Sequence, residues 1–200
     1  HKIWCMTQMR LSISCAPMPD SVDIANAPDI TTAFAASGVT RNRNDTAASS
    51  GKGVARMSAG SRIDLRPFTR EDLPSMVRWN NDPEVEYYVD CDLPKSLPEC
   101  ADWFRANVPS RDYRLFAIQY EGCLLGDLEL DHISWRNGEA EFRIRIGEKD
   151  YWNRGFGTEA VRLLLELAFA SMGLRRIHLK VYRFNRRAIQ IGRASCRERV

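Results

Sequence analysis

The sequence has no apolar run near the roughly 18 residues that a membrane-spanning helix needs. It has no large excess of charge of one sign either, since it contains 29 basic and 26 acidic residues and its formal net charge is +3. Its six cysteines follow no framework spacing, and its three histidines join no cluster with metal-ligand spacing. These absences argue against a membrane protein, a disulfide scaffold and a metal centre. They favour a reducing, cytoplasmic setting.

The two ends of the chain differ from the middle. Residues 1–56 show neither helical nor strand periodicity. They are expected to be a disordered tail, or untranslated upstream sequence read in frame with the true start at Met57. Residues 191–200 resemble the conceptual translation of a common short-read sequencing adapter, so they are excluded from fold reasoning. The native protein is then expected to continue past Gln190.

The middle of the chain is close to neutral. Residues 1–56 contain six basic and four acidic residues, and residues 191–200 contain three basic residues and one acidic residue. Each of these flanks therefore contributes a net charge of +2. That leaves −1 for residues 57–190. A segment of this charge predicts neither a nucleic-acid partner nor a membrane partner. Its length suits one α/β domain.

Residues 57–190 contain alternating signals for strands and helices. The expected order is β-α-α-β-β-β-α-β, followed by a helix that Asn185 caps. Strands are expected over 63–66, 113–120, 123–130, 140–147 and 176–182, and helices after Thr69, Ser96 and Gly157. His178 alternates outward on the last strand and is expected at the surface.

The most informative segment is 151–160, Tyr-Trp-Asn-Arg-Gly-Phe-Gly-Thr-Glu-Ala, between a predicted strand and a predicted helix. Two glycines at such a junction, Gly155 and Gly157, let backbone N–H groups approach a ligand closely. The helix N-terminus adds partial positive charge, so the segment suits a pyrophosphate. Two pyrophosphates fit this pattern, that of coenzyme A and that of a dinucleotide.

The dinucleotide alternative rests on Gly155-x-Gly157-x-x-Ala160, which matches a known fingerprint. It expects a carboxylate after the next strand, where Arg183 stands instead. Arg183 could hold the 2′-phosphate of NADP, which keeps an NADP-binding reductase as an alternative. The position of the motif argues against a reductase. A dinucleotide-binding fold has this motif after a first, buried parallel strand, whereas here it comes late in the chain and after hairpins.

Residues 62–190 resemble the GNAT acetyltransferase superfamily, in particular the branch of ribosomal-protein N-terminal alanine acetyltransferases and spermidine acetyltransferases. The segments that carry the resemblance are Leu65-Arg66-Pro67 with the later Asn81-Asp82-Pro83, Glu139 to Ala160 as motif A, and Asn185-x-x-Ala188-Ile189 as the start of motif B. The resemblance implies the α/β GNAT acyl-CoA N-acyltransferase fold, a mixed, mostly antiparallel sheet flanked by helices.

Motif B departs from the family pattern. The family has a tyrosine about three residues after the position of Ile189, which acts as general acid toward the departing thiolate. Gly192 stands at that position. The C-terminal strands that complete the family's sheet and acceptor pocket are also missing. The chain itself is therefore expected to be inactive, although its parent is expected to be an enzyme.

The resemblance implies that acetyl-CoA is the co-substrate and that its acetyl group passes directly to a primary amine. Backbone N–H groups near the two glycines are expected to cradle the pyrophosphate, and the preceding strand to pair with the pantetheine arm. A backbone N–H of that strand would polarise the thioester carbonyl. The predicted coenzyme-binding residues are Arg143, Ile144, Arg145, Ile146, Trp152, Asn153, Arg154, Gly155, Phe156, Gly157, Thr158 and Asn185.

An alkylamine is mostly protonated near neutral pH, so the reaction needs a base or a water chain. Glu139, Glu141 and His132 are the predicted catalytic candidates, because they lie near the hairpin that joins the two central strands. The spacing of Glu139 and Glu141 puts both on one strand face. The alternative is that they are solvated charges of the hairpin.

The acceptor is expected to be a small-molecule or peptide amine with positive charge. The acidic segment from Asp82 to Asp92 is expected to border its site and attract a polyamine, an aminoglycoside or a peptide N-terminus. The alternative is an acidic surface loop. A non-catalytic acyl-CoA-binding sensor on the same fold is the other functional alternative. The sequence does not predict an oligomeric state.

Overall fold

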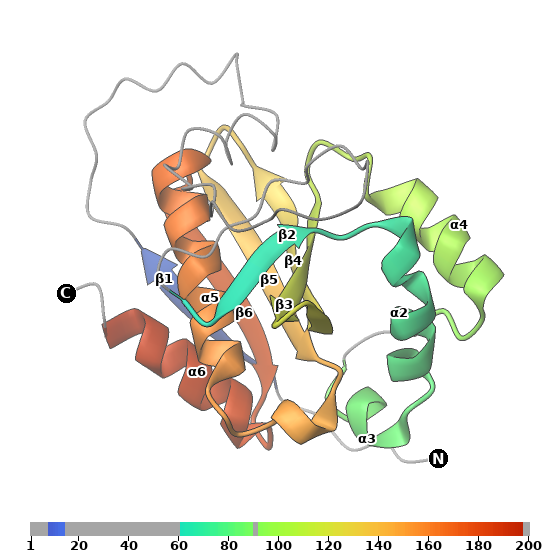
Figure 1. Cartoon of the computed structure of the whole chain (residues 1–200). Helices are drawn as coiled ribbons and strands as arrows, with labels where there is room; N and C mark the ends of the chain where they lie inside the picture. The colour runs from blue at the N-terminus through green and yellow to red at the C-terminus, as the bar shows by residue number, and fades with distance from the viewer. Residues whose placement is uncertain (1–7, 15–60, 90–91, 198–200) are drawn as a thin grey trace, which may run out of the picture.

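The computed structural model describes residues 8–14, 61–89 and 92–197, which form a six-stranded sheet in the order β1-β6-β5-β4-β3-β2 (Figure 1). The strands are β1 (Gln8–Ser14), β2 (Ile63–Pro67), β3 (Arg114–Tyr120), β4 (Cys123–Ser134), β5 (Glu139–Ile146) and β6 (Arg176–Tyr182). Every neighbouring pair is antiparallel except β5 and β6, which are parallel. The predicted mixed, mostly antiparallel sheet is confirmed.

Helical segments lie between these strands and after the last one. They are η2 (Arg70–Asp72), α2 (Leu73–Asn80), α3 (Pro83–Glu86), α4 (Leu97–Asn107), η3 (Lys149–Tyr151), α5 (Phe156–Glu166), the π-helical η4 (Leu167–Ser171) and α6 (Arg186–Arg197). Capping boxes begin η2 and α4, as the sequence predicts. Over the described residues, none of the helices combines the length and the apolar character that crossing a membrane requires.

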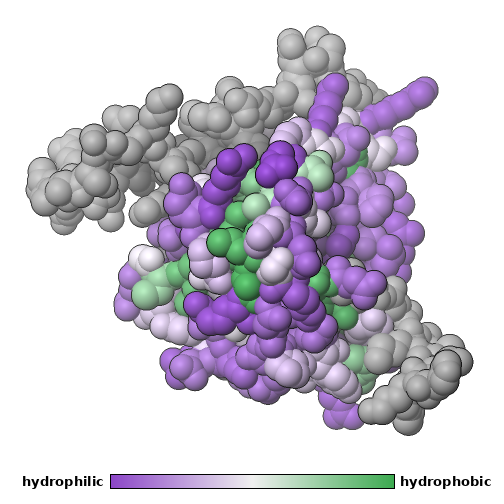
Figure 2. Space-filling view, turned by 90° about the vertical axis from the view of Figure 1, so that its right-hand side faces the viewer, coloured by the Kyte–Doolittle hydropathy of each residue, from purple (hydrophilic) through white to green (hydrophobic). Residues whose placement is uncertain are grey.

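Helices cover both faces of the sheet. Along β3, Phe116 and Ile118 enter the larger hydrophobic cluster, which α5 covers, whereas Leu115 and Ala117 enter the smaller cluster under α2 and α4. Successive side chains of a strand point to opposite faces, so the two clusters lie on opposite sides. Figure 1 shows α2 and α4 grouped together, well away from α5 and α6. Seen from the α2 and α4 side, hydrophobic residues form a narrow central strip among hydrophilic ones (Figure 2).

The strands β5 and β6 pair over only part of their length. Their last paired residues are Phe142 and Leu179, yet β5 continues to Ile146 and β6 to Tyr182. In the part of the chain that the structure describes, the β5 edge from Ile144 to Ile146 therefore has no strand beside it on the β6 side. An extended ligand can pair with such an edge as an added strand.

Residues 8–14 form the edge strand β1, so the expectation of no strand within residues 1–56 is wrong for this segment. Met9, Leu11 and Ile13 alternate with polar residues, a period-2 signal that the polar composition of the long segment obscured. β1 pairs with β6 over seven residues. The rest of the segment, and the proposed start at Met57, lie outside the described residues.

The strand β1 also changes the environment of His178. Ser12 Oγ lies 2.9 Å from His178 Nδ1, and the histidine is buried. The expectation of a surface histidine is wrong, because β1 covers this edge of the sheet. Burial lowers the pKa of His178 below its ordinary value, and the nearby Arg10 adds to this effect.

The last helix, α6, begins as predicted but extends further than expected. The Asn185 side chain accepts a hydrogen bond of 3.1 Å from the Ala188 N–H, which caps the helix. α6 then continues to Arg197, although residues 191–200 were excluded from the fold. Gly192 makes the close packing possible, because a Cβ there would lie 2.7 Å from Leu11 Cδ1. The origin of residues 191–200 stays a prediction.

Candidate active site

A cavity of about 470 Å³ lies where β5 and β6 separate and α5 begins. Its walls contain ten of the twelve predicted coenzyme-binding residues: Ile144, Arg145, Ile146, Trp152, Asn153, Gly155, Phe156, Gly157, Thr158 and Asn185. Arg143 lines a neighbouring cavity instead, and Arg154 lines neither. The strand edge and the glycine-containing loop thus share one cavity, which we call the donor cavity.

The loop before α5 leaves the first turn of this helix without a side-chain cap. Gly155 is the N-cap of α5, has φ of +86°, and gives the helix no side-chain cap. Asn153 also has a positive φ, of 62°. Because no capping side chain covers them, the N–H groups of the first turn of α5 can donate to an anion in the cavity. The Trp152 indole donates to the Ile146 carbonyl over 2.7 Å and ties the loop to β5.

The donor cavity has a positive lining. Arg145 and Arg187 are in its walls, and among the described residues no aspartate or glutamate lines it. The Arg187 guanidinium lies over the Trp152 ring at 4.2 Å and over the Tyr88 ring at 4.9 Å. The two arginines and the uncapped N–H groups of α5 fit a pyrophosphate, and the unpaired β5 edge fits an amide-containing arm such as pantetheine.

A second, smaller cavity of about 180 Å³ adjoins the first. The two share the lining residues Tyr88, Val89, Ile144, Arg145, Asn185 and Ala188. We call the second one the acceptor cavity and these six residues the junction. A group bound in the donor cavity can meet one bound in the acceptor cavity at this junction.

Carboxylates of β4 line the acceptor cavity and are paired across the sheet with arginines of β5. Asp127 lies opposite Arg145, and Glu129 lies opposite Arg143 with 3.0 Å between charged atoms. The Tyr113 hydroxyl donates to Glu129. Burial raises the pKa of Glu129 above its ordinary value, although Arg143 opposes this effect.

Sequence reasoning missed Asp127 and Glu129 as site residues. The signal was present, since Asp127 and Glu129 alternate with leucines as Arg143 and Arg145 alternate with isoleucines. Two such patterns on adjacent strands predict cross-strand ion pairs on one face. Which residues face each other across the two strands depends on their register, and no pattern in the sequence predicted that register.

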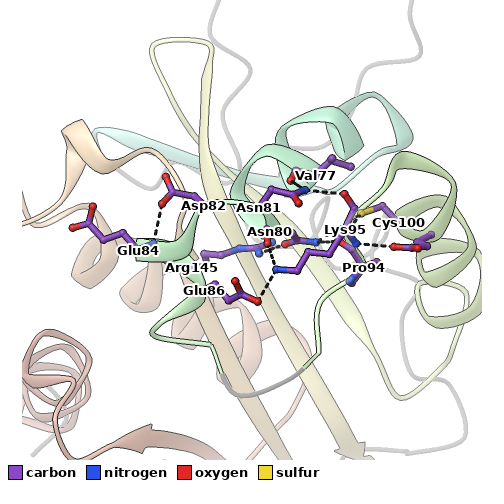
Figure 3. Close-up of polar contacts among 11 residues, drawn as sticks. Val77, Asn80, Asn81, Asp82, Glu84, Glu86, Pro94, Lys95, Cys100 and Arg145 are labelled. Carbon is purple, nitrogen blue, oxygen red and sulfur yellow. Dashed lines mark hydrogen bonds and ion pairs between the residues drawn. The ribbon is translucent and has the colours of Figure 1, made fainter. Parts of the chain in front are cut away.

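Asn80 connects the acceptor side to β5 (Figure 3). Its side chain donates to the Pro94 carbonyl over 2.7 Å and accepts from the Arg145 guanidinium. Lys95 Nζ donates to the Asn80 carbonyl over 2.5 Å and to Glu86 over 2.6 Å. The segments before and after residues 90–91 are therefore both attached to the strand that lines the donor cavity. Sequence reasoning did not find Asn80, because its partners are distant in sequence.

None of the three predicted catalytic residues is in the wall of either cavity. His132 is exposed, has φ of +51° and pairs with Asp131 at 3.2 Å. Glu139 pairs with Arg176 at 3.2 Å. Glu141 is buried and pairs at 2.8 Å with Lys180, which lines the acceptor cavity. The structure brings Glu141 nearest to the site, and the role of each residue stays a prediction.

The acidic segment is largely neutralised by ion pairs within the chain. Asp82 and Glu84 pair with Lys149 at 2.7 and 3.4 Å. The Asp82 carboxylate also accepts from the Glu84 N–H, and together with Lys149 this holds the pKa of Asp82 below its ordinary value. Asp92 lines the acceptor cavity, and it makes no ion pair with another described residue. Asp90 lies outside the described residues.

Comparison with known proteins identifies the family. The model of the acetyltransferase (GNAT) domain matches residues 62–194. The chain belongs to the GNAT acetyltransferase family. This GNAT chain therefore uses acetyl-CoA as its acetyl donor, and the predicted enzyme class is confirmed. In the described part of the chain the sheet has a single parallel strand pair, unlike the doubly wound parallel sheet of a dinucleotide-binding fold. This removes the reductase alternative.

The relatives of this GNAT chain include the spermidine N(1)-acetyltransferase of Escherichia coli (strain K12), 28% identical over 137 residues, which cover 68% of this chain and 73% of that protein. The uncharacterized N-acetyltransferase p20 of Bacillus licheniformis is 27% identical over 135 residues, which cover 65% of this chain and 75% of that protein. The Vibrio cholerae spermidine N-acetyltransferase in complex with CoA and spermine has the same fold, with a TM-score of 0.62 and 24% identity. The match covers 68% of this chain and 79% of that structure's chain.

Proposed function

We propose that this chain transfers the acetyl group of acetyl-CoA to a primary amine of an extended cationic acceptor, of the polyamine class. The observation that carries the proposal is the junction, where a cavity at the uncapped N-terminus of α5, with an unpaired strand edge, meets a cavity with carboxylates in its wall. Relatives that act on spermidine support the acceptor class. The proposal concerns residues 62–194, the part of the chain that matches the family.

On the donor side, the first turn of α5 binds the pyrophosphate through backbone N–H groups. The β5 edge from Ile144 to Ile146 pairs with the pantetheine arm, which orients the thioester toward the junction. Asn185 has its side-chain oxygen in use as a helix cap, so its amide N–H₂ is the part available to the arm. A backbone N–H of β5 near Ile144 polarises the thioester carbonyl.

On the acceptor side, the carboxylates have unequal roles. Asp127 is paired with Arg145, with both side chains almost fully covered, so it serves mainly to hold the strands. Asp92 is exposed and makes no ion pair in the described part of the chain, so its charge is available to an ammonium group. Aromatic rings of Tyr88, Trp103 and Tyr182 in the same walls can cover the methylene chain of a polyamine.

Glu129 is the best-placed proton acceptor in the wall of the acceptor cavity. Its raised pKa makes it a stronger base than an exposed carboxylate. Glu141, the nearest of the residues predicted from sequence, reaches the cavity only through Lys180. We therefore assign removal of the amine proton to Glu129, directly or through one water.

The test is acetyl transfer by the purified chain with a panel of acceptors. Released thiol and product mass are measured with spermidine, spermine, an alanine-terminated peptide and kanamycin. The proposal expects transfer to the polyamines with a higher kcat/KM than to the other two. Transfer to the peptide alone would contradict the acceptor class, and acetyl-CoA binding without any transfer would favour the sensor alternative.

Asp92→Asn is expected to raise KM for spermidine roughly fivefold, because one exposed charge contributes about 1 kcal/mol. The value of kcat is expected to stay the same, since the charge attracts the acceptor without touching the reacting atoms. Asp102→Asn is the matched control, as Asp102 is exposed on α4 and outside both cavities. Equal KM values for the two variants would exclude Asp92 from acceptor binding.

A further inference from the structure

The loop before α5 is held from outside the donor cavity by Arg62. Arg62 Nη2 donates to the Arg154 carbonyl over 3.3 Å, directly before Gly155, and the guanidinium lies over the Phe156 ring at 4.7 Å. Arg62 comes immediately before β2, which is an edge strand of the sheet. Figure 1 shows the start of β2 beside α5. These contacts therefore attach the N-terminus of α5 to the sheet.

Glu159, in the first turn of α5, fixes the Arg62 side chain. One carboxylate oxygen of Glu159 accepts from the Ser61 hydroxyl and from the Arg62 backbone N–H, each over 2.7 Å. The other oxygen accepts from Arg62 Nε over 3.1 Å and lies 3.0 Å from Nη2. Both oxygens of the carboxylate are thus used within this group. We call Ser61, Arg62 and Glu159 the loop clamp.

The place of Glu159 gives the charge of Arg62 a second effect. A helix N-terminus attracts anions through its partial positive charge, whereas an unbalanced carboxylate in the first turn would repel a pyrophosphate. Burial acts to raise the pKa of Glu159, but the hydrogen bonds from Ser61 and Arg62 outweigh this and hold the pKa below its ordinary value. Glu159 is therefore ionised near neutral pH, and Arg62 supplies the charge that balances it.

We propose that Arg62 is a positioning residue for acetyl-CoA, which holds the loop before α5 in place for the pyrophosphate and balances the carboxylate beside it; the inference rests on the proposed binding of the pyrophosphate at the first turn of α5. None of the three loop-clamp residues lines either cavity, so the clamp acts through the loop and does not touch the coenzyme. Gly155, next to the carbonyl that Arg62 holds, does line the donor cavity.

The loop clamp is expected to affect coenzyme binding more than folding. The side chain of Arg62 is 56% exposed, and exposed ion pairs contribute little to stability. The Trp152 indole still ties the other end of the loop to β5 when Arg62 is replaced. Loss of the clamp should therefore leave the sheet intact and free only the end of the loop that adjoins Gly155.

The test is a calorimetric titration of acetyl-CoA into the wild-type chain and into Arg62→Met. The dissociation constant is expected to rise about tenfold, the effect of losing one hydrogen bond to a charged group. With spermidine as acceptor, KM for acetyl-CoA is expected to rise by the same factor, whereas kcat stays the same because Arg62 is away from the reacting atoms. Arg105→Met is the matched control, since Arg105 and Asp102 form an exposed pair at 3.0 Å on α4 and line neither cavity.

A shorter ligand separates the pyrophosphate from the rest of the coenzyme. Acetyl-pantetheine contains the thioester and the arm but no pyrophosphate. Arg62→Met and the wild type are expected to bind it with the same dissociation constant, because the loop then has no anion to bind. An equal loss of affinity for both ligands would show general damage to the site and would overturn the proposal.

The double variant Arg62→Met with Glu159→Gln tests the charge. Glutamine keeps an oxygen that can accept from Ser61 and from the backbone N–H of residue 62, and it removes the unbalanced negative charge. The double variant is expected to bind acetyl-CoA more tightly than Arg62→Met does. Binding no tighter than that of Arg62→Met would contradict the proposed balance of charge.

The variants and the wild type answer different questions. Unchanged acetyl-CoA binding by Arg62→Met, or the same loss in Arg105→Met, overturns the inference about the loop clamp. A wild-type chain that binds acetyl-CoA but acetylates no amine overturns the proposed function instead, and the dissociation constants of the variants then still decide the inference. A wild-type chain that does not bind acetyl-CoA overturns both.

Discussion

Gly126→Ala is expected to separate β4 from β5 and abolish acetyl-CoA binding. An alanine Cβ at this position would overlap the Arg145 carbonyl oxygen and lie 2.9 Å from Ile146 Cα. These are backbone atoms of the strand that lines the donor cavity, so no side-chain rotation relieves the overlap. We expect a loss of more than about 4 kcal/mol in the free energy of unfolding, the range seen when a change breaks a packed core.

The free energy of unfolding in urea, measured with and without acetyl-CoA, checks this prediction. Gly122→Ala is the matched control in the same hairpin. Gly122 has φ of +80°, and a Cβ there meets nothing within 4 Å, so the change adds only backbone strain of about 1–2 kcal/mol. Suppose that Gly126→Ala lowers the free energy of unfolding no more than Gly122→Ala does and still binds acetyl-CoA. The close approach of β4 and β5 at Gly126 would then be contradicted.

Arg145→Met is expected to destabilise the chain by about 3–5 kcal/mol, because it leaves the buried Asp127 carboxylate unpaired. The side chains of Arg145 and Asp127 are only 13% and 11% exposed. The variant also removes the hydrogen bond to Asn80, so the segment before Tyr88 loses its connection to β5. The double variant Arg145→Met with Asp127→Leu is expected to recover most of the lost stability, since no buried charge remains.

A double-mutant cycle in urea measures this coupling. Arg162→Met is the control, because Arg162 and Glu166 are a solvent-exposed pair on α5 whose loss is expected to cost at most about 0.5 kcal/mol. A double variant as unstable as Arg145→Met would show that the cost comes from lost packing and not from the unpaired carboxylate. We expect the stabilised double variant to transfer acetyl groups slowly, because Arg145 also lies at the junction.

Local signals were enough to predict most elements from the sequence. Alternation predicted β2 and β6, and capping side chains predicted the starts of α4 and α6. The donor cavity was predictable for the same reason, since the loop before α5 and the end of β5 are adjacent in sequence. Ten of its residues were named because one short motif contains most of them.

The acceptor side could not be predicted in this way, because it is built from segments far apart in the chain. Asn80, Asp127 and Arg145 meet only when the α2–α3 turn packs against the β4–β5 hairpin. β1 was missed because its pairing energy comes from β6, which is more than 160 residues away in sequence. Glu139 and His132 were chosen for their nearness to a hairpin, and nearness in sequence did not bring them into the cavity walls.

The most direct test of the central claim is a calorimetric titration of acetyl-CoA into the wild-type chain and into Gly155→Ala. The account predicts one acetyl-CoA per wild-type chain, no heat with NADP, and greatly weakened binding for Gly155→Ala, whose left-handed residue at the α5 N-terminus is strained by a Cβ. Gly122→Ala carries similar strain away from the cavity and is expected to bind as the wild type does. Undiminished binding by Gly155→Ala, or saturable binding of NADP, would contradict the account.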